Sequence, residues 1–265
     1  MDIKIGIAYH KKAQLLNSPV YIPIHVGKAL SNSCICNQGD DEGDNISKEN
    51  IYYCELTALY WLWKNTTSDF KGLFHYRRIL FPQTSLNSIF RSIIGRFRSR
   101  FYVPEVSLNQ KDFVRIARDF SNKIENLCSR YDIITTKKIH ANLSVQEHFS
   151  SIGMEYMNLL DEYFQESGKD YLKIYNDYRR GNTFYFANIS IMKDELFNEY
   201  CSFLFSALED VKQKLLNRGY IKDLYKEKIF SRKLGYLGEI LTGVYITNAK
   251  KHNYRVKELS VARCI

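Results

Sequence analysis

The feature that most constrains the fold of this chain is a series of short apolar runs that each stop at polar or basic residues. Residues 3–9 form the first run, residues 20–26 the second and residues 70–74 the third. Apolar runs of this length, separated by segments with helical spacing, are typical of buried strands in α/β proteins. We therefore predict an α/β fold with a mostly parallel sheet flanked by helices.

The segments between and after these runs show the periodicity of amphipathic helices. In residues 51–64, an apolar stripe of Leu56, Leu59, Tyr60 and Trp63 follows the i, i+3, i+4 and i+7 positions of one helix face. Comparable patterns predict further helices over residues 111–130, 144–166, 170–179, 194–217 and 235–247, and strands at residues 131–134 and 184–191.

Composition narrows the class of partner. The chain has 265 residues, with 38 Lys and Arg against 29 Asp and Glu, and this net charge of +9 favours an anionic partner such as nucleic acid, a phosphorylated small molecule or an acidic membrane face. Its six cysteines are scattered, without the paired spacing of a zinc site. We find no signal-peptide pattern and no apolar run long enough to span a membrane, so we expect a protein kept in a reducing cytoplasm.

Three of the predicted strand ends are basic, namely residues 10–12, 75–78 and 137–138. Ligands bind at the carboxyl ends of strands in open α/β sheets, and parallel strands would bring these clusters to one edge. The neighbouring guanidinium groups of Arg77 and Arg78 suit phosphate oxygens, which they can contact in pairs. Each cluster taken alone is better explained as a solvated loop, but three of them at three strand ends favour an anion site.

Motifs of several common enzyme classes are missing. No G-x-G-x-x-G, P-loop or G-x-S-x-G sequence occurs, which disfavours dinucleotide oxidoreductases, P-loop kinases and α/β-hydrolases. Residues 89–102 instead combine Ile and Phe with four arginines, the pattern of a basic amphipathic helix on a membrane surface. We expect this segment to contact the anionic inner face of the membrane, with packing on its own domain as the alternative.

Two motifs carry a family resemblance. Residues 55–61 read Glu-Leu-Thr-Ala-x-Tyr-Trp, and residues 75–78 read His-Tyr-Arg-Arg. Weaker matches lie at residues 10–11, 21–30, 43–47, 131–134, 188–193 and 238–239. Together these stretches span nearly the whole chain, which resembles a bacterial family catalogued as a domain of unknown function. Members of that family are described as glycosyltransferases of capsular polysaccharide and exopolysaccharide synthesis.

The resemblance implies one GT-A-like domain over residues 1–265, built on a Rossmann-type sheet. Residues 1–138 would form the nucleotide-sugar-binding half, and residues 139–265, with the C-terminal helices, the acceptor-side half. The implied enzyme is a hexosyltransferase whose donor is a nucleoside-diphosphate sugar, with UDP as the expected nucleotide and galactose, as pyranose or furanose, among the candidate sugars. Its acceptor would be a lipid-linked intermediate or an oligosaccharide in capsule, exopolysaccharide or O-antigen synthesis, on the cytoplasmic side of the cell membrane.

The resemblance also bears on metal dependence. GT-A-like enzymes generally hold Mn²⁺ or Mg²⁺ with an Asp-x-Asp motif at a strand end, whereas here the corresponding strand ends in residues 75–78. We hypothesise that Arg77 and Arg78 replace the metal by neutralising the departing diphosphate, so no metal cofactor is expected. The acidic residues within 40–44 keep Mn²⁺ or Mg²⁺ open as the alternative.

An inverting mechanism, which we favour, needs a general base. Glu239, near the start of the last predicted helix, is the first candidate, and Asp44 and Glu55 are the alternatives. Asn188 and Gly238 are assigned to the donor sugar or the acceptor. Nucleotide and diphosphate binding is assigned to His10, Lys11, Asn45, His75, Tyr76, Arg77 and Arg78.

Two readings from other classes compete with an enzyme. A nucleic-acid-binding protein would explain the positive charge, but no nucleic-acid motif is present and the acidic stretch at residues 40–44 opposes it, so we expect no nucleic-acid partner. A non-catalytic scaffold of a polysaccharide assembly complex would keep the same binding residues. The sequence does not separate this second reading from an active transferase.

Overall fold

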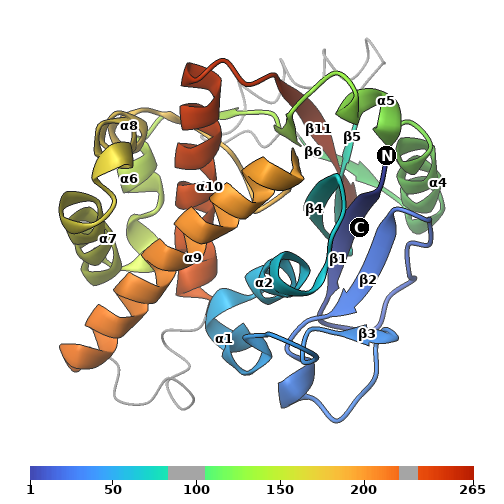
Figure 1. Cartoon of the computed structure of the whole chain (residues 1–265), viewed down its shortest axis with the longest axis horizontal. Coiled ribbons are helices and arrows are strands. Elements are labelled where there is room, and N and C mark those ends of the chain that lie inside the picture. Colours follow the sequence, from blue (N-terminus) through green and yellow to red (C-terminus); the bar gives the residue numbers. More distant parts are fainter. Residues whose placement is uncertain (83–104, 221–231) are drawn as a thin grey trace.

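The structure is a computed structural model that describes residues 1–82, 105–220 and 232–265 (Figure 1). The predicted membrane-contacting segment, residues 89–102, lies outside the described residues. Within the described ranges, no helix combines the length and the apolar character needed to cross a bilayer.

The first part of the sheet is parallel and is built from the apolar runs near the start of the chain. Its strands are β1 (Ile3–Tyr9), β2 (Tyr21–His25), β3 (Gln38–Gly39) and β4 (Phe70–His75). β1 lies between β2 and β4, in a register that pairs Tyr9 with His25 and Ala8 with His75. The carboxyl ends of these strands therefore meet at one edge, as the sequence predicted.

The remainder of the sheet is mixed. Its strands are β5 (Arg78–Phe81), β6 (Glu105–Leu108), β7 (Ile133–Thr136), β10 (Ser190–Lys193) and β11 (Val256–Cys264). β10 runs antiparallel to both β4 and β7, while β11 is parallel to β6 and β7 and antiparallel to β5. Among the described strands of this sheet, only β5 and β10 run against the direction of β4. The sheet is therefore mixed, and the sequence could not reveal these two reversals because a buried apolar strand reads the same in either direction.

The predicted strand at residues 184–191 is also corrected. The chain forms a short strand β9 (Thr183–Phe184), which pairs with β8 (Ile139–His140), and only later enters β10. Residues 185–189 between them have no regular structure. This irregular stretch lies next to the carboxyl end of β4, because β10 starts with Ser190 opposite Leu73.

The described helices cover both faces of the sheet. They are α1 (Asn50–Tyr53), α2 (Leu56–Asn65), α4 (Gln110–Ser121), α5 (Ile124–Cys128), α6 (Val145–His148), α7 (Met154–Glu166), α8 (Lys169–Arg180), α9 (Asp194–Asn217) and α10 (Lys233–Lys251), with short 3₁₀ turns at Lys28–Leu30, Ser47–Glu49 and Ser150–Ile152. α4 and α5 pack on one face, and α2 and α9 pack on the other. α7–α10 also pack against one another, so the second half of the chain forms a helical flank beside the sheet (Figure 1).

Two predicted helices are interrupted by residues with positive φ. The helix predicted over residues 51–64 breaks between α1 and α2 at Cys54, whose φ is 52°. The helix predicted over residues 144–166 breaks before α7 at Gly153, whose φ is 116°. Hydrophobic periodicity continues across both breaks, so it could not reveal them. The first break turns the chain at the carboxyl edge of the sheet, where the functional site lies.

Candidate functional site

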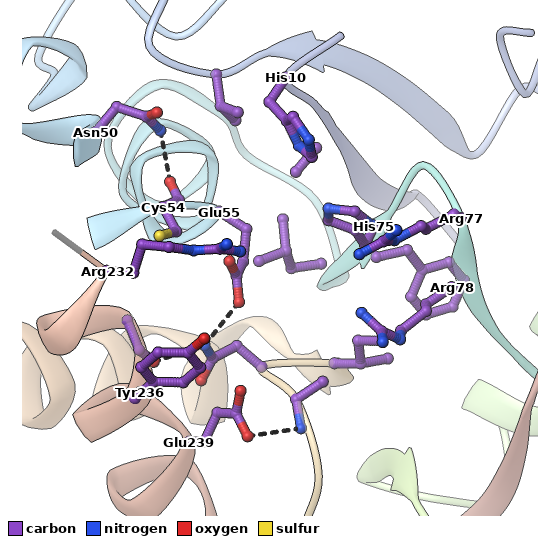
Figure 2. Close-up of a pocket in the computed structure, with 18 of the residues that line it drawn as sticks. His10, Asn50, Cys54, Glu55, His75, Arg77, Arg78, Arg232, Tyr236 and Glu239 are labelled. Atoms are coloured by element: carbon purple, nitrogen blue, oxygen red, sulfur yellow. Dashed lines mark hydrogen bonds between the residues drawn. The ribbon is translucent and has the colours of Figure 1, made fainter. Parts of the chain in front are cut away.

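A pocket of about 800 Å³ opens at the carboxyl ends of β1 and β4 (Figure 2). Its walls come from the β4–β5 turn, the α1–α2 junction, the irregular stretch before β10 and the first turns of α10. The polar or ionisable residues that line it are His10, Asn50, Cys54, Glu55, His75, Arg77, Arg78, Asn188, Arg232, Tyr236 and Glu239. Segments far apart in the sequence thus form one cavity.

The β4–β5 hairpin brings two arginines to one wall of the pocket. His75 of β4 pairs directly with Arg78 of β5, so the turn between them is short. The Nε of Arg78 donates to Oε1 of Glu105 at 2.6 Å, which compensates part of the charge of Arg78. No described carboxylate forms an ion pair with Arg77, and its Nε is buried without a hydrogen-bond partner among the described residues. Arg77 therefore retains its capacity for an anionic ligand.

Two histidines lie beside these arginines. The rings of His10 and His75 have their centroids 5.5 Å apart. Burial and the charge of Arg77 lower the pKa of His10, and burial together with His10 lowers the pKa of His75 to about 3. Both imidazoles are therefore neutral at neutral pH. They can donate or accept hydrogen bonds without adding charge to the pocket.

Arg232 supplies a third guanidinium from another wall (Figure 2). It precedes α10 in a left-handed conformation, with φ 69°, and its N–H donates to the carbonyl of Ile51 at 2.8 Å. Its guanidinium contacts the thiol of Cys54, and its charge contributes to the lowered pKa values of His10 and His75. The positive charges of Arg77, Arg78 and Arg232 therefore all act on His75.

Two carboxyl groups line the pocket, those of Glu55 and Glu239. Nδ2 of Asn188 donates to Oε1 of Glu55 at 2.9 Å, and the N–H of Ala187 donates to Oε2 of Glu239 at 3.3 Å (Figure 2). Burial, reinforced by the negative charge of Glu55, raises the pKa of Glu239 to about 8. Glu239 therefore keeps its proton at neutral pH.

The position of Glu55 depends on strained backbone at Cys54. Cys54 has φ 52° and ψ −127°, a conformation that costs on the order of 1–3 kcal/mol in a residue other than glycine. Its N–H donates to the carbonyl of Asn50 at 2.8 Å, and Nδ2 of Asn50 donates back to the carbonyl of Cys54 at 2.7 Å. This reciprocal pair holds the break between α1 and α2, from which Glu55 faces the cavity.

The structure brings together seven of the residues that the sequence predicted for the site. These are His10, Glu55, His75, Arg77, Arg78, Asn188 and Glu239. Tyr76 lies behind the pocket, buried against the rings of His10 and His75, and Lys11 lies 5.7 Å from the centroid of the Tyr76 ring. Neither of these two side chains lines the cavity.

Three other predicted residues lie outside the cavity. Oδ1 of Asp44 accepts from the hydroxyl of Tyr60 at 3.1 Å, and the amide of Asn45 donates to the carbonyls of its own loop. Gly238 is buried against α2, where a Cβ would lie 2.7 Å from Cδ1 of Leu56. These contacts describe loop and packing roles for Asp44, Asn45 and Gly238.

The third basic strand end, residues 137–138, also lies outside the pocket. Nζ of Lys138 is 5.5 Å from the centroid of the Tyr185 ring and does not line the pocket. The site instead includes Asn50, Arg232 and Tyr236, which the sequence did not single out. Arg232 offered one signal, because a cation at the start of a predicted helix is disfavoured by the helix dipole.

The pocket residues do not form an evident metal centre. Across residues 1–82, 105–220 and 232–265, no three His, Cys, Asp or Glu side chains are grouped closely enough to hold a metal ion. Glu55 and Glu239 are two carboxylates, and each already accepts a hydrogen bond from the segment before β10.

The pocket thus brings the guanidinium groups of Arg77, Arg78 and Arg232 together with the carboxyl groups of Glu55 and Glu239 at one edge of a mixed α/β sheet. The chain belongs to the family described as Domain of unknown function (DUF4422), whose model matches residues 4–251. It is similar over 100% of its length to the structure "WbbM bifunctional glycosyltransferase apo structure", with 27% identity and a TM-score of 0.81, and covers 45% of that chain. No curated protein matches.

Proposed function

We propose that this protein is a glycosyltransferase that takes its sugar from a nucleoside-diphosphate donor. The observation that carries the proposal is the pocket itself, where Arg77, Arg78 and Arg232 line the same cavity as Glu55 and Glu239, with a volume large enough for a nucleotide sugar. The likeness to part of a bifunctional glycosyltransferase supports the same class of activity. Because this chain spans less than half of that protein, either of its two activities is compatible with the likeness alone.

The guanidinium groups are proposed to hold the donor diphosphate and to stabilise the charge that develops as it leaves. Arg77 and Arg232 lack ion-pair partners among the described residues, and Arg78 keeps its outer nitrogens beside the pocket. Charged donors fixed around a leaving group act much as a metal ion would. We therefore propose transfer without a metal cofactor, in the GT-A-like manner that the sequence resemblance implies.

Glu239 is proposed as the general base. The acceptor hydroxyl oxygen forms a bond to the anomeric carbon, the bond from that carbon to the diphosphate oxygen breaks, and its electron pair leaves with the diphosphate. The hydroxyl proton passes to the carboxylate of Glu239, and the configuration at the anomeric carbon inverts. A pKa raised to about 8 makes this carboxylate a stronger base than an exposed glutamate.

The finer identity of the substrates is taken from what the family resemblance implies. We propose UDP as the nucleotide, a hexose such as galactose as the sugar, and a lipid-linked or oligosaccharide acceptor of capsule, exopolysaccharide or O-antigen synthesis. The basic amphipathic residues 89–102, which lie outside the described residues, are proposed to meet this acceptor at the inner membrane face. Failure to sediment with anionic liposomes would count against that contact.

A thermal-shift panel tests the proposed function directly. Nucleoside diphosphates and sugar nucleotides should raise the melting temperature, because a ligand that binds only the folded state stabilises it. Uridine should have less effect than UDP, since it lacks the diphosphate, and single-stranded or duplex oligonucleotides should have none at physiological salt. Stabilisation by oligonucleotides alone would instead support a nucleic-acid-binding protein. Transfer from a radiolabelled sugar nucleotide then separates an enzyme from a non-catalytic scaffold.

A further inference from the structure

The two carboxylates of the pocket are held by consecutive residues of one segment. The backbone N–H of Ala187 donates to Glu239, and the side chain of Asn188 donates to Glu55 (Figure 2). Glu55 lies just before α2 and Glu239 lies on α10, far apart in the sequence. Residues 187–188 therefore set how these two acidic groups face each other.

The amide of Asn188 has little capacity left for a ligand. Nδ2 donates to Oε1 of Glu55 at 2.9 Å and to the carbonyl of Gly235 at 3.2 Å, while Oδ1 accepts from the hydroxyl of Thr242 at 3.1 Å. The residue is only 3% exposed. Because two acceptors face Nδ2 and a hydroxyl faces Oδ1, the orientation of the amide is determined. Asn188 therefore acts through Glu55, and the expectation that it touches the sugar is replaced.

The support for Asn188 extends into the core. The hydroxyl of Thr242, on α10, also lies 2.7 Å from the carbonyl oxygen of Gly238, so its single proton is shared between that oxygen and Oδ1 of Asn188. The same hydroxyl lies 2.7 Å from the hydroxyl of Tyr200 on α9. Thr242 and Tyr200 are both buried. A continuous chain of hydrogen bonds thus runs from the Glu55 carboxylate to the packed interface of α9 and α10. Such a chain fixes a side chain more firmly than a single contact does.

The neighbouring residue, Ala187, is held in an uncommon conformation. Its φ is 60°, which is rare for a residue other than glycine. Thr136 and Thr135 of β7 anchor the segment on both sides, through bonds to the carbonyls of Phe186 at 3.2 Å and Ile189 at 3.1 Å. These anchors keep the N–H of Ala187 directed at Glu239.

We propose that Asn188 is a positioning residue that holds the carboxylate of Glu55 in the pocket, next to the segment that binds Glu239, so that the charge of Glu55 acts on the proposed base. This inference rests on the proposed glycosyl transfer, in which Glu239 receives the acceptor proton. A fixed negative charge at Glu55 strengthens the base, because it favours the proton on its neighbour. Without Asn188, the Glu55 side chain is free to turn towards the cation of Arg232.

Other charged and titratable groups also act on Glu239. Arg78 on β5 opposes the effect of Glu55, as does the N–H of Ala187. The thiol of Cys54 and the hydroxyl of Tyr178, on α8, lie close enough for Glu239 to raise their pKa values. Cys54 and Tyr178 remain neutral throughout the relevant pH range. The negative charge of Glu55 is therefore the neighbouring charge whose removal or displacement should change the pKa of Glu239.

The test compares the pH dependence of kcat/KM in the wild type with that of Glu55→Gln, Asn188→Ala and Thr242→Val. The wild-type rate should rise with pH through a midpoint near the pKa of Glu239. Glu55→Gln and Asn188→Ala should each move that midpoint down by roughly one pH unit, since a like charge is removed or displaced. Thr242→Val should move it less, in the same direction, and Thr242→Ser should restore it.

A matched control is Asn198→Ala, because Asn198 also donates to a carboxylate, Asp194, at 3.0 Å but lies away from the pocket. It should leave the midpoint unchanged. Unchanged midpoints in both Glu55→Gln and Asn188→Ala, with folding and UDP affinity intact, would overturn the inference.

A second measurement keeps the inference testable without activity. The melting temperature of the wild type should fall between mildly acidic and mildly alkaline pH as Glu239 ionises, and Glu55→Gln should show a smaller fall. If UDP and sugar nucleotides fail to bind but this difference is present, the proposed function is wrong and the inferred coupling stands. If UDP binds and the melting temperatures of the wild type and Glu55→Gln fall equally with pH, the inferred coupling between Glu55 and Glu239 is wrong.

Discussion

At alkaline pH the Glu239→Gln variant should be more stable than the wild type, although it loses the proposed base. The reason is the raised pKa of Glu239, about 8 in the folded protein against an ordinary value of 4.5. Below the lower value the acid is protonated in both the folded and the unfolded state, and stability does not depend on it. Between the two values only the unfolded state gives up its proton, so stability falls as pH rises and the loss is complete above the folded pKa.

The size of the effect follows from the interval between the two pKa values, 4.5 and about 8. At about 1.4 kcal/mol for each pH unit, the upper limit is ~5 kcal/mol. The pocket is open to solvent and Glu239 is partly exposed, so water screens its charge and we expect ~2 kcal/mol. Glutamine keeps an oxygen for the N–H of Ala187 and carries no charge, so the variant avoids this cost at every pH.

The assay is denaturation of both proteins from about pH 5 to about pH 9, followed by circular dichroism. The two should be equally stable at the acidic end, and the variant should melt roughly 4–8 °C higher at the alkaline end. Glu162→Gln is the control, because the ion pair with Arg218 lowers the pKa of Glu162 at the surface, so this change should not stabilise the protein at alkaline pH. Parallel pH profiles for the wild type and Glu239→Gln would refute the raised pKa.

Three further outcomes are expected. Arg77→Gln and Arg232→Gln should each weaken UDP binding by roughly 10- to 100-fold in calorimetry while leaving uridine binding unchanged, since each removes charge-assisted hydrogen bonds to the diphosphate; equal losses for both ligands would contradict this role. Transfer should persist after exhaustive chelation, and complete loss rescued only by Mn²⁺ would refute the replacement of a metal by arginine. Gly72→Ala should destabilise the fold by about 1–3 kcal/mol in urea denaturation, because its Cβ would lie 2.6 Å from the carbonyl oxygen of Ser190. The control Gly181→Ala, where the nearest atom is 3.3 Å from the added Cβ, should destabilise the fold less. Equal stabilities of the two variants would argue against the close approach of β4 and β10.

The sequence by itself determined the features that depend on local patterns. β1, β2 and β4 lie where the apolar runs predict them, because a buried strand needs a continuous apolar segment. His10, His75 and Arg77 were predictable as neighbours for the same reason, since parallel strands carry their final residues to one edge. The sequence alone was therefore enough to predict the wall of the pocket that contains these cationic residues.

The residues of the other pocket walls are brought together only by the tertiary structure. The bond from Asn188 to Glu55 joins residues 133 positions apart, and nothing in the spacing of either residue indicates the other. The direction of β10 and the place of Arg232 also depend on how α10 and the segment before β10 pack on the sheet. Periodicity records which face of an element is buried, whereas the chemistry of this pocket arises where the ends of several elements meet. Those meetings are set by packing between distant segments, which a local pattern does not record.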